Sequence, residues 1–359
     1  MNNKPKEIIE IDNVHPVIAS KRDNQIFISS SITSGLFEMS EPLEAGYVYN
    51  IGYDQVKLEL KKDNNDTSVV NNLSDFDKLV YDAICSIDVM MRQKLNKLRV
   101  RRMEQMESEG CSKEAIAAMI ASPEYTLPVF STRQVYKLIS GELAYGTHPT
   151  IEALANIEES IKKLSSLKID ISYESPDDKD SRDSSAAYLL QLTEQKKNIS
   201  QIDEDGNIIK ERVKYYTIDR VPILYQYAIF KESLSVLPSA LIQTKSVRNT
   251  KSLLSVKGYL INRILDVGFL NEHSVLINFN PIYDLVEAAD AKRKTRARES
   301  VFKLLDDWIE SGFIEKWEIC ETTSGKRKTP VAIMVHLENN YSYSKVIENY
   351  EKMLGKRDE

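Results

Sequence analysis

The sequence has few cysteines and few histidines, and this shortage limits the chemistry that can be assigned to it. Its 359 residues include three cysteines and four histidines. Cys85, Cys111 and Cys320 are widely spaced and odd in number, which favours reduced, buried thiols in a cytoplasmic protein over a disulfide framework. The histidines stand apart from one another and no Cys-x-x-Cys pair is present, so zinc sites and metal-dependent nicking have no support.

Long apolar runs and phosphate-binding loops are also missing. No stretch approaches the roughly 18–20 apolar residues of a membrane span, and the N-terminus MNNKPKEIIEIDN lacks the apolar core of a signal peptide. SGKRKT (324–329) lacks the first glycine of a nucleotide-binding loop. The adjacent carboxylates Asp306 and Asp307 would point about 100° apart on a helix and would not converge. We therefore expect a cytoplasmic protein that is not an enzyme and binds no cofactor or metal.

Positive charge is not abundant in the whole chain but is dense in one place. The formal net charge is −6, yet AKRKTRAR (291–298) carries five positive charges in eight residues, directly before the helical pattern ESVFKLLDDWIESG. A helix start already presents the positive end of the backbone dipole, so each cation there costs about 0.3–1 kcal/mol at the surface. Such a conflict with a local preference is typical of a functional site.

A helix over 291–312, closed by Gly312, would place apolar and basic side chains on opposite sides. The predicted buried stripe is Ala297, Val301, Leu304, Leu305 and Trp308. The opposite side carries Lys292, Arg296, Glu299 and Lys303, with Thr295 beside them and Arg293 and Arg298 flanking the stripe. Lys294 falls near the core side, which suggests that the helix begins nearer Thr295 than Ala291.

A second basic cluster follows in a predicted hairpin. FIEKWEICE (313–321) and PVAIMVHL (330–337) read as strands, and the turn between them contains Lys326, Arg327 and Lys328. In a winged helix the third helix enters a DNA groove and the hairpin loop, the wing, lies beside it on the phosphates. The predicted DNA-binding residues are Lys292, Arg293, Lys294, Thr295, Arg296, Arg298, Lys303, Lys326, Arg327 and Lys328. The alternative interpretation of these charges is a solvated face.

The element pattern predicts an α+β fold, mainly α, with two tandem winged-helix domains and a small N-terminal β-containing extension. The expected segments are the extension (1–70), a first unit (71–220), a second unit (221–338) and a C-terminal helical tail (339–359). In the extension, QIFISSS and YVYNIGYDQVKLELKK read as strands. Between the units, 219–242 reads as a helix that opens the second unit.

The predicted elements of the two units follow one order. Those of the first unit are a helix from Leu73, a helix over 130–142, a helix over 147–167, and the strands 168–174 and 186–197 joined by the acidic wing 175–185. A hairpin turn at 203–207 then leads into a strand over 208–218. Those of the second unit are a helix over 250–268, a short strand, a helix over 280–290 capped by Asn280, the basic helix and its hairpin. Capping pairs Ser74–Asp77 and Ser131–Gln134 mark two of the helix starts.

The third helix of the first unit lacks the basic face of its counterpart. Its predicted buried side is Ile151, Leu154, Ile157, Ile161 and Leu164, and its outward side is Glu152, Asn156, Glu159 and Lys163. Phosphates would be repelled by the two carboxylates and by the acidic wing, so self-association or contact with another protein is the expected role. The basic stretch KLNKLRVRRMEQM (94–106) is open to two interpretations, an exposed face or an extra phosphate contact.

Five segments resemble the replication initiators of plasmids and integrative mobile elements from low-GC Gram-positive bacteria. They are LSDFDKLVYDAICSI, FSTRQVYKLISGE, IEESIKKLSSLKIDI, VPILYQYAIFKE and ESVFKLLDDWIESGFIEKW. The resemblance spans roughly residues 70–338. It implies monomers that bind direct repeats at an origin, dimers that form through the first winged helix and repress the initiator's promoter, and a host helicase, helicase loader and initiator as partners. It also implies that no nicking tyrosine is present.

Two other hypotheses remain open at the level of sequence. One is a transcriptional regulator or partition factor that uses the same DNA-binding surface. The other is a nuclease or recombinase whose active site is assembled from distant residues. Short direct repeats beside the gene favour the initiator, a single palindrome favours the regulator, and metal-dependent cleavage of DNA favours the nuclease.

Overall fold

The computed structural model describes most of the chain between residues 26 and 337. The described residues are 26–30, 36–37, 48–51, 54–60, 73–122, 126–140, 149–174, 182–202, 208–231, 234–238, 246–247, 249–269, 273–324 and 327–337. More of them lie in helices than in strands, and the strands form small sheets, so the α+β, mainly helical class is confirmed. The predicted tail over 339–359 lies outside the described residues. Among the described residues, no helix has the length and hydrophobicity that a membrane crossing requires.

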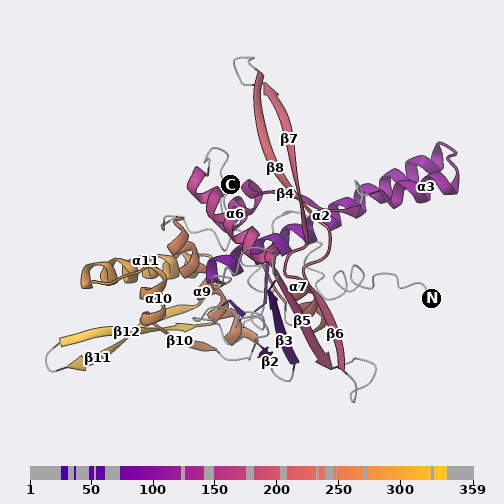
Figure 1. Cartoon of the computed structure of the whole chain (residues 1–359). Coiled ribbons are helices and arrows are strands. Elements are labelled where there is room, and N and C mark those ends of the chain that lie inside the picture. The colour runs from indigo at the N-terminus through magenta and orange to yellow at the C-terminus, as the bar shows by residue number, and fades with distance from the viewer. Residues whose placement is uncertain are drawn as a thin grey trace.

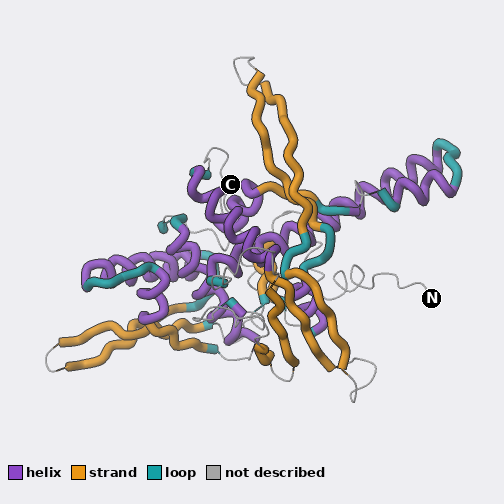
Figure 2. The backbone as a smooth tube through the Cα atoms, in the orientation of Figure 1, coloured by secondary structure: helices purple, strands orange, loops and turns teal. Residues whose placement is uncertain are grey.

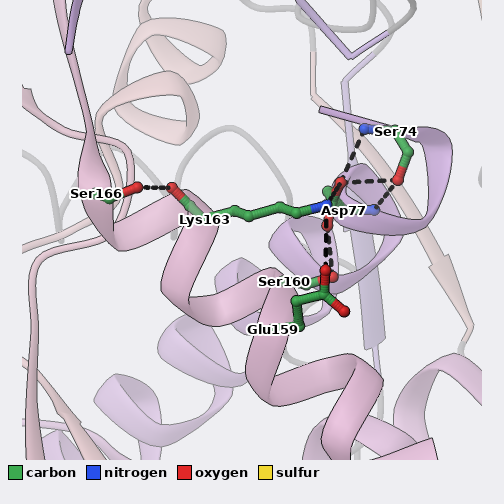
Figure 3. A network of polar contacts seen from close by, with 6 residues as sticks. All are labelled: Ser74, Asp77, Glu159, Ser160, Lys163 and Ser166. Atoms are coloured by element: carbon green, nitrogen blue, oxygen red, sulfur yellow. Dashed lines mark hydrogen bonds and ion pairs between the residues drawn. The ribbon is translucent and has the colours of Figure 1, made fainter. Parts of the chain in front are cut away.

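A long central helix organises the first unit. The helices here are α2 (Asp75–Ser108), α3 (Lys113–Ile120), α5 (Thr132–Ser140) and α6 (Ile151–Ser166), and α7 (Ile223–Phe230) follows the unit. α2 begins with the predicted capping box, because the Ser74 hydroxyl accepts from the Asp77 N–H and the Asp77 carboxylate accepts from the Ser74 N–H. The same carboxylate accepts from the Ser160 hydroxyl and lies 3.8 Å from the Lys163 ammonium, so one buried group joins the start of α2 to α6 (Figure 3).

The sheets of the first unit differ from the prediction. The strands are β2 (Val48–Ile51), β3 (Asp54–Leu60), β4 (Val129–Ser131), β5 (Leu167–Glu174), β6 (Arg182–Tyr188), β7 (Leu192–Ile202) and β8 (Ile208–Ile218). They form one sheet in the order β2-β3-β5-β6 and another in the order β4-β8-β7. The short strand before α5 therefore pairs with the β7–β8 hairpin, and the hairpin β5–β6 joins the N-terminal strands.

The prediction of one strand over 186–197 was wrong, because parts of two strands, β6 and β7, lie there. Of the predicted wing, 182–185 belong to β6, and 175–181 lie outside the described residues. Leu189 and Leu190 are buried, and their N–H groups donate to the carbonyls of Leu167 and Leu164. These contacts turn the chain inward between β6 and β7, so each side of the turn belongs to a different sheet. The β7–β8 hairpin pairs with β4 through β8 and extends away from the body, as Figure 2 shows.

The second unit follows the predicted order of elements. They are α9 (Lys251–Phe269), β10 (Ser274–Asn278), α10 (Phe279–Leu285), α11 (Ala291–Glu310), β11 (Lys316–Ser324) and β12 (Arg327–His336). The strands pair in the order β10-β12-β11, which matches β4-β8-β7 position for position. The predicted cap at Asn280 was wrong, because α10 begins two residues earlier and Asn278 stands at its N-cap. Its first residue, Phe279, is fully buried and fixes that start.

The two units pack against each other through α2 and α9 (Figure 1). A side-chain carbon at Gly258 would lie 3.2 Å from the carbonyl oxygen of Asp75 and 3.6 Å from Cβ of Leu79, so glycine permits the close approach of the helices. The Lys251 ammonium lies 5.6 Å from the centre of the Phe76 ring at the same interface. The units are therefore one packed body in this structure.

The segment between the units and the cysteines both require corrections. Only α7 is helical within 219–242, and β9 (Ser235–Pro238) follows it and pairs with β1 (Ile26–Ser29). Strands predicted in the N-terminal extension are present, but they pair with later segments rather than with one another alone. Cys85 is buried as expected, whereas Cys111 is exposed and Cys320 is half-buried. All three are free thiols.

Candidate nucleic-acid interface

The start of α11 is fixed by an acidic residue that precedes the basic run. The Asp290 carboxylate accepts a hydrogen bond of 2.8 Å from the Arg293 N–H and lies 3.5 Å from the Arg293 guanidinium. An aspartate at the N-cap satisfies a free N–H group and places negative charge at the positive end of the dipole. This cap allows the helix to begin at Ala291, so the expectation that it begins nearer Thr295 was wrong.

The inner face of α11 anchors the helix as predicted. Its buried residues are Ala297, Val301, Leu304, Leu305 and Trp308. The Trp308 ring packs edge to face against Phe313, with 5.2 Å between ring centres. Gly312 ends the helix with a positive φ of 71°, a conformation that glycine adopts without strain. The stripe therefore fixes which side chains of α11 face outward.

The outward face of α11 carries an exposed basic row. Lys292, Arg293, Arg296 and Lys303 are exposed, and Glu299 is exposed among them. Lys292 and Lys303 are eleven residues apart, which corresponds to about 16 Å along the helix. Within the described residues, only Arg293 of these cations is in an ion pair, the one with Asp290. The row is thus free to contact a negatively charged ligand over three turns of helix.

Two further cations of α11 are oriented by Tyr283 on α10. Arg298 donates from Nη1 to the Tyr283 hydroxyl at 2.9 Å and from Nη2 to the Thr295 hydroxyl at 3.1 Å. The Lys294 ammonium lies 5.1 Å from the centre of the Tyr283 ring. Lys294 is therefore half-buried against an aromatic ring rather than directed into the core. Thr295 donates to the carbonyl of Ala291, so its hydroxyl links the first turn of the helix to Arg298.

Sequence reasoning missed both Tyr283 and Asp290. Asp290 stands directly before the basic run, where an N-cap aspartate is a recognised start signal, so this residue could have been found. Tyr283 could not, because its contact with Arg298 joins two helices across a turn.

The β11–β12 hairpin extends to the same side of the second unit as α11 (Figure 1). Lys328 is 72% exposed, and its ammonium lies 3.9 Å from the Glu321 carboxylate across the two strands. Lys326 lies outside the described residues. The backbone of Arg327 pairs with Ser324 at the end of the hairpin. The helix and the hairpin that carry the two predicted clusters therefore extend to the same side of the unit.

The equivalent helix of the first unit differs from α11. Ile157, Ile161 and Leu164 are buried as predicted, but Ile151 is 89% exposed, so its predicted burial was wrong. It is the first residue of α6. Glu152 and Glu159 are exposed, as expected for an outward face that disfavours phosphate. Lys163 is instead drawn inward, toward Asp77.

The β7–β8 hairpin of the first unit is not acidic along its strands. Its sequence in β7 and β8 contains Lys196, Lys197, Lys210, Arg212 and Lys214 against two glutamates. The Lys214 ammonium lies 3.0 Å from the Glu158 carboxylate of α6 and 3.7 Å from that of Glu194. The loop between these strands, 203–207, contains Asp203, Glu204 and Asp205 and lies outside the described residues. The exposed carboxylates of α6 therefore remain the argument against DNA contact by this unit.

A buried cation lies behind α11. The Lys257 ammonium on α9 has no hydrogen-bond partner within the described residues and lines a small pocket between α9 and α11, together with Val256, Ser300 and Leu304. Burial lowers the pKa of Lys257 to about 7, and the carboxylate of Asp307 opposes that shift. Asp307 itself accepts hydrogen bonds from the N–H and hydroxyl of Ser246.

Metal-binding clusters were sought in the same part of the chain. Among the described residues, no group of three or more His, Cys, Asp or Glu side chains is placed to hold a metal ion.

Comparison with known proteins identifies no family. No protein-family model matches the chain, and no curated protein matches it. Among solved structures, the chain is similar to domains 2 and 3 of RctB, with a TM-score of 0.41 and 9% identity over 83% of this chain and 90% of that one. A selenomethionine derivative of the same domains gives a TM-score of 0.36 and 10% identity over 79% and 87%. Likenesses this weak carry no argument about function.

Proposed function

We propose that the protein binds double-stranded DNA sequence-specifically, without enzymatic activity, through the second unit. The observation that carries this proposal is the exposed basic row on α11, which lies opposite a fully buried stripe. The order of elements and the β10-β12-β11 sheet support a winged helix, in which this helix enters the major groove. Arg293 and Arg296 are the side chains best placed to read bases, since an arginine paired bidentately with guanine discriminates by about 1–3 kcal/mol.

The remaining cations are assigned to the DNA backbone. Lys326, Arg327 and Lys328 on the hairpin would bind phosphates beside the groove, which sets affinity rather than sequence. Arg298 is held by Tyr283 and Thr295, so it reaches a phosphate with less loss of side-chain freedom than an unattached arginine. The Asp290 carboxylate would compete with a phosphate for Arg293.

The first unit is proposed to be a second winged helix that contacts protein. The strand order β4-β8-β7 matches that of the second unit and supports the repeated fold. Exposed Glu152 and Glu159 on α6 disfavour phosphate, so a protein or another copy of the chain is the better-suited partner of this face. Self-association through this unit is therefore part of the proposal.

The biological role proposed is replication initiation on a plasmid or mobile element. It rests on the sequence segments that resemble such initiators and extends to origin repeats as the DNA site and to a host helicase, helicase loader or initiator as partners. A transcriptional regulator or partition factor is the alternative. Footprints over several short direct repeats beside the gene support initiation, whereas a single protected palindrome supports regulation.

The decisive experiment is footprinting on DNA flanking the gene with the Arg293→Ala/Arg296→Ala variant. We expect protection to be lost while the fold is retained, because both side chains are exposed. A matched control, Lys137→Ala/Lys162→Ala, removes the same charge from exposed positions of α5 and α6. The proposal fails if the α11 variant protects the same sites with undiminished affinity.

Two further measurements separate this proposal from its competitors. If about six phosphates are contacted, log K falls with log salt at a slope near −5, and a slope near zero removes the electrostatic argument. Incubation of supercoiled DNA with the pure protein and Mg²⁺ or Mn²⁺ should leave the DNA intact. Metal-dependent cleavage would instead support the nuclease or recombinase hypothesis.

A further inference from the structure

The far half of α2 and the short helix α3 form an arm that leaves the body of the protein. All residues of α2 from Asp75 to Val89 are buried, whereas none from Lys94 to Ser108 is buried. α3 contacts α2 and folds back beside it at the tip, as Figure 1 shows. We call residues 92–120 the arm. The arm projects on the side of the molecule opposite to α11 (Figure 1).

The arm has an inner and an outer face. The half-buried residues of this part of α2 repeat at helical spacing and include Leu95, Arg99, Met103 and Met106. The half-buried residues of α3 include Ile116 and Met119, so these sides face each other. The exposed residues along the opposite side of α2 are Lys94, Lys97, Leu98, Arg101, Glu104, Gln105 and Ser108. They form the outer face.

Charge is divided by sign along the outer face. The half nearer the body carries Lys94, Lys97 and Arg101, and the half nearer the tip carries Glu104, with Glu107 beside it. Within the described residues, none of these five side chains is in an ion pair. The last turn of α2 contains no basic residue, although the negative end of the dipole favours one there. The arm thus presents unpaired charge of both signs in a fixed order.

We propose that the outer face of the arm binds the same face of a second copy, with the two α2 helices antiparallel. Exposed positions 94, 101 and 108 alternate with 97 and 104 on α2, at the three- and four-residue spacing that keeps them on one side of the helix. In an antiparallel pair, positions 101 and 108 of one helix face positions 104 and 97 of the other. Arg101 then lies opposite Glu104 of the second copy, and Glu104 opposite its Arg101. A two-fold axis makes each such contact twice.

Nucleic acid is the less suitable occupant of the outer face. Phosphates that approach Lys97 and Arg101 also approach Glu104 and Glu107, which repel them. The arm also points away from α11, so DNA held by α11 does not pass along it (Figure 1). A second copy provides partners for both the basic and the acidic side chains of this face, whereas a polyanion provides partners only for the basic ones.

The contact should be weak and sensitive to salt. Leu98, 43% exposed, is the apolar side chain on the outer face, so charge pairing supplies most of the attraction. Exposed charge pairs are screened within about 8 Å at physiological ionic strength. This inference rests on the proposed self-association and identifies the surface that mediates it. It does not depend on DNA binding by α11.

Charge reversal tests the pairing of the full-length protein by sedimentation at low salt. Arg101→Glu and Glu104→Arg each place like charges together twice, so each should weaken self-association at least about tenfold. The double variant Arg101→Glu/Glu104→Arg restores opposite charges and should regain wild-type association, and an equal mixture of the two single variants should form heterodimers. Lys137→Glu, at an exposed position of α5, is the control for net charge.

A cysteine cross-link provides a second test that does not depend on weak equilibria. Position 97 should lie opposite Ser108 of the second copy, and the two positions are about 16 Å apart along one helix, so only an intermolecular disulfide can form. With Cys111→Ser as the background, Lys97→Cys/Ser108→Cys treated with diamide should give a covalent dimer, and neither single cysteine variant should.

Three outcomes would overturn the inference. They are a wild-type protein that stays monomeric at low salt, a double charge variant that fails to regain association, and a cross-link that forms equally well in Lys97→Cys or Ser108→Cys alone. If the single charge reversals instead change binding to random-sequence DNA, the arm is a nucleic-acid surface. Footprinting with the charge variants reports on α11 separately, so failure here is distinguishable from failure of the proposed function.

Discussion

The guanidinium of Arg298 donates a hydrogen bond of 2.9 Å to the hydroxyl oxygen of Tyr283. The bond joins α11 to α10 at the edge of the candidate DNA-binding face. The ring of Tyr283 also lies beneath the Lys294 ammonium and stacks on Phe279, with 5.9 Å between ring centres. One tyrosine therefore fixes the directions of two cations that lie one turn apart on the same side of α11.

Tyr283→Phe should weaken DNA binding without unfolding the protein. The ring and its stacking remain, but Arg298 loses the group that orients it, so we expect affinity to fall about three- to tenfold. Fluorescence anisotropy on the footprinted site measures the change, and thermal unfolding checks that the fold is intact. Tyr215→Phe in β8 is the control. Unchanged affinity would mean that the Arg298 bond has no part in binding.

Features set by near neighbours in the chain were predictable from the sequence. The capping pairs Ser74–Asp77 and Ser131–Gln134 are present, because they need only residues three apart. The buried stripe of α11 was predicted residue by residue, since helical spacing alone determines it. The second unit was therefore predicted in its full order of elements.

Features set by distant segments were not predictable. β1 pairs with β9, and β3 pairs with β5, across more than 100 residues of chain. The alternation of apolar and polar residues identifies a strand but not the strand that it pairs with, so the pairing of β5 with β3 was not predicted. The exposure of Ile151 has the same origin, because an apolar residue at a helix start is buried only if another element covers it.

Asp290 supports the helix and also competes with DNA, and two substitutions separate these roles. Asp290→Asn keeps an oxygen that caps the Arg293 N–H but removes the charge beside the guanidinium. We expect it to tighten DNA binding about two- to fivefold, the size of an exposed ion pair. Asp290→Ala removes the cap as well and should lower the free energy of unfolding by about 0.5–2 kcal/mol.

These two effects require two measurements on the same proteins. Anisotropy titrations give the DNA affinity, and urea unfolding gives the stability. If Asp290→Asn binds DNA more weakly than the wild type, the carboxylate does not compete with phosphate and the assignment of Arg293 to the DNA is in doubt.

Gly258 should be intolerant of larger side chains because α2 lies against it. Its replacement by valine would force a branched side chain toward the Asp75 carbonyl, where even Cβ lies at 3.2 Å. We expect a loss of about 1–3 kcal/mol of stability, the usual cost of overpacking. Ser252→Val on the exposed side of α9 controls for the valine itself. Equal losses in the two variants would show that the helix contact is not tight.

The same contact bears on how the units should be studied. A fragment that lacks residues 1–220 would expose the face of α9 that α2 covers, and the ring of Phe76 would be lost from Lys251. Substitutions in the full-length chain are therefore the better tests of what each unit does.

Lys257 should make the stability of the protein depend on pH in a defined direction. In the folded protein its pKa is lowered from 10.5 to about 7. Between these values the unfolded chain binds a proton that the folded chain does not, so the free energy of unfolding rises with pH. The slope from this group is about 1.4 kcal/mol per pH unit. Below about pH 7 both states are protonated, and the contribution of Lys257 no longer changes.

Lys257→Met tests this dependence, because methionine has a similar shape and no charge. We expect the variant to be more stable than the wild type at pH 7 and to lose the Lys257 part of the slope between pH 7 and pH 9.5. Urea unfolding of both proteins at each pH gives the difference, in which other titrating groups cancel. Asp307→Asn removes the carboxylate that favours the protonated amine, so it should lower the pKa of Lys257 further. Parallel pH profiles for the wild type and Lys257→Met would mean that the ammonium is neutralised by a group beyond the described residues.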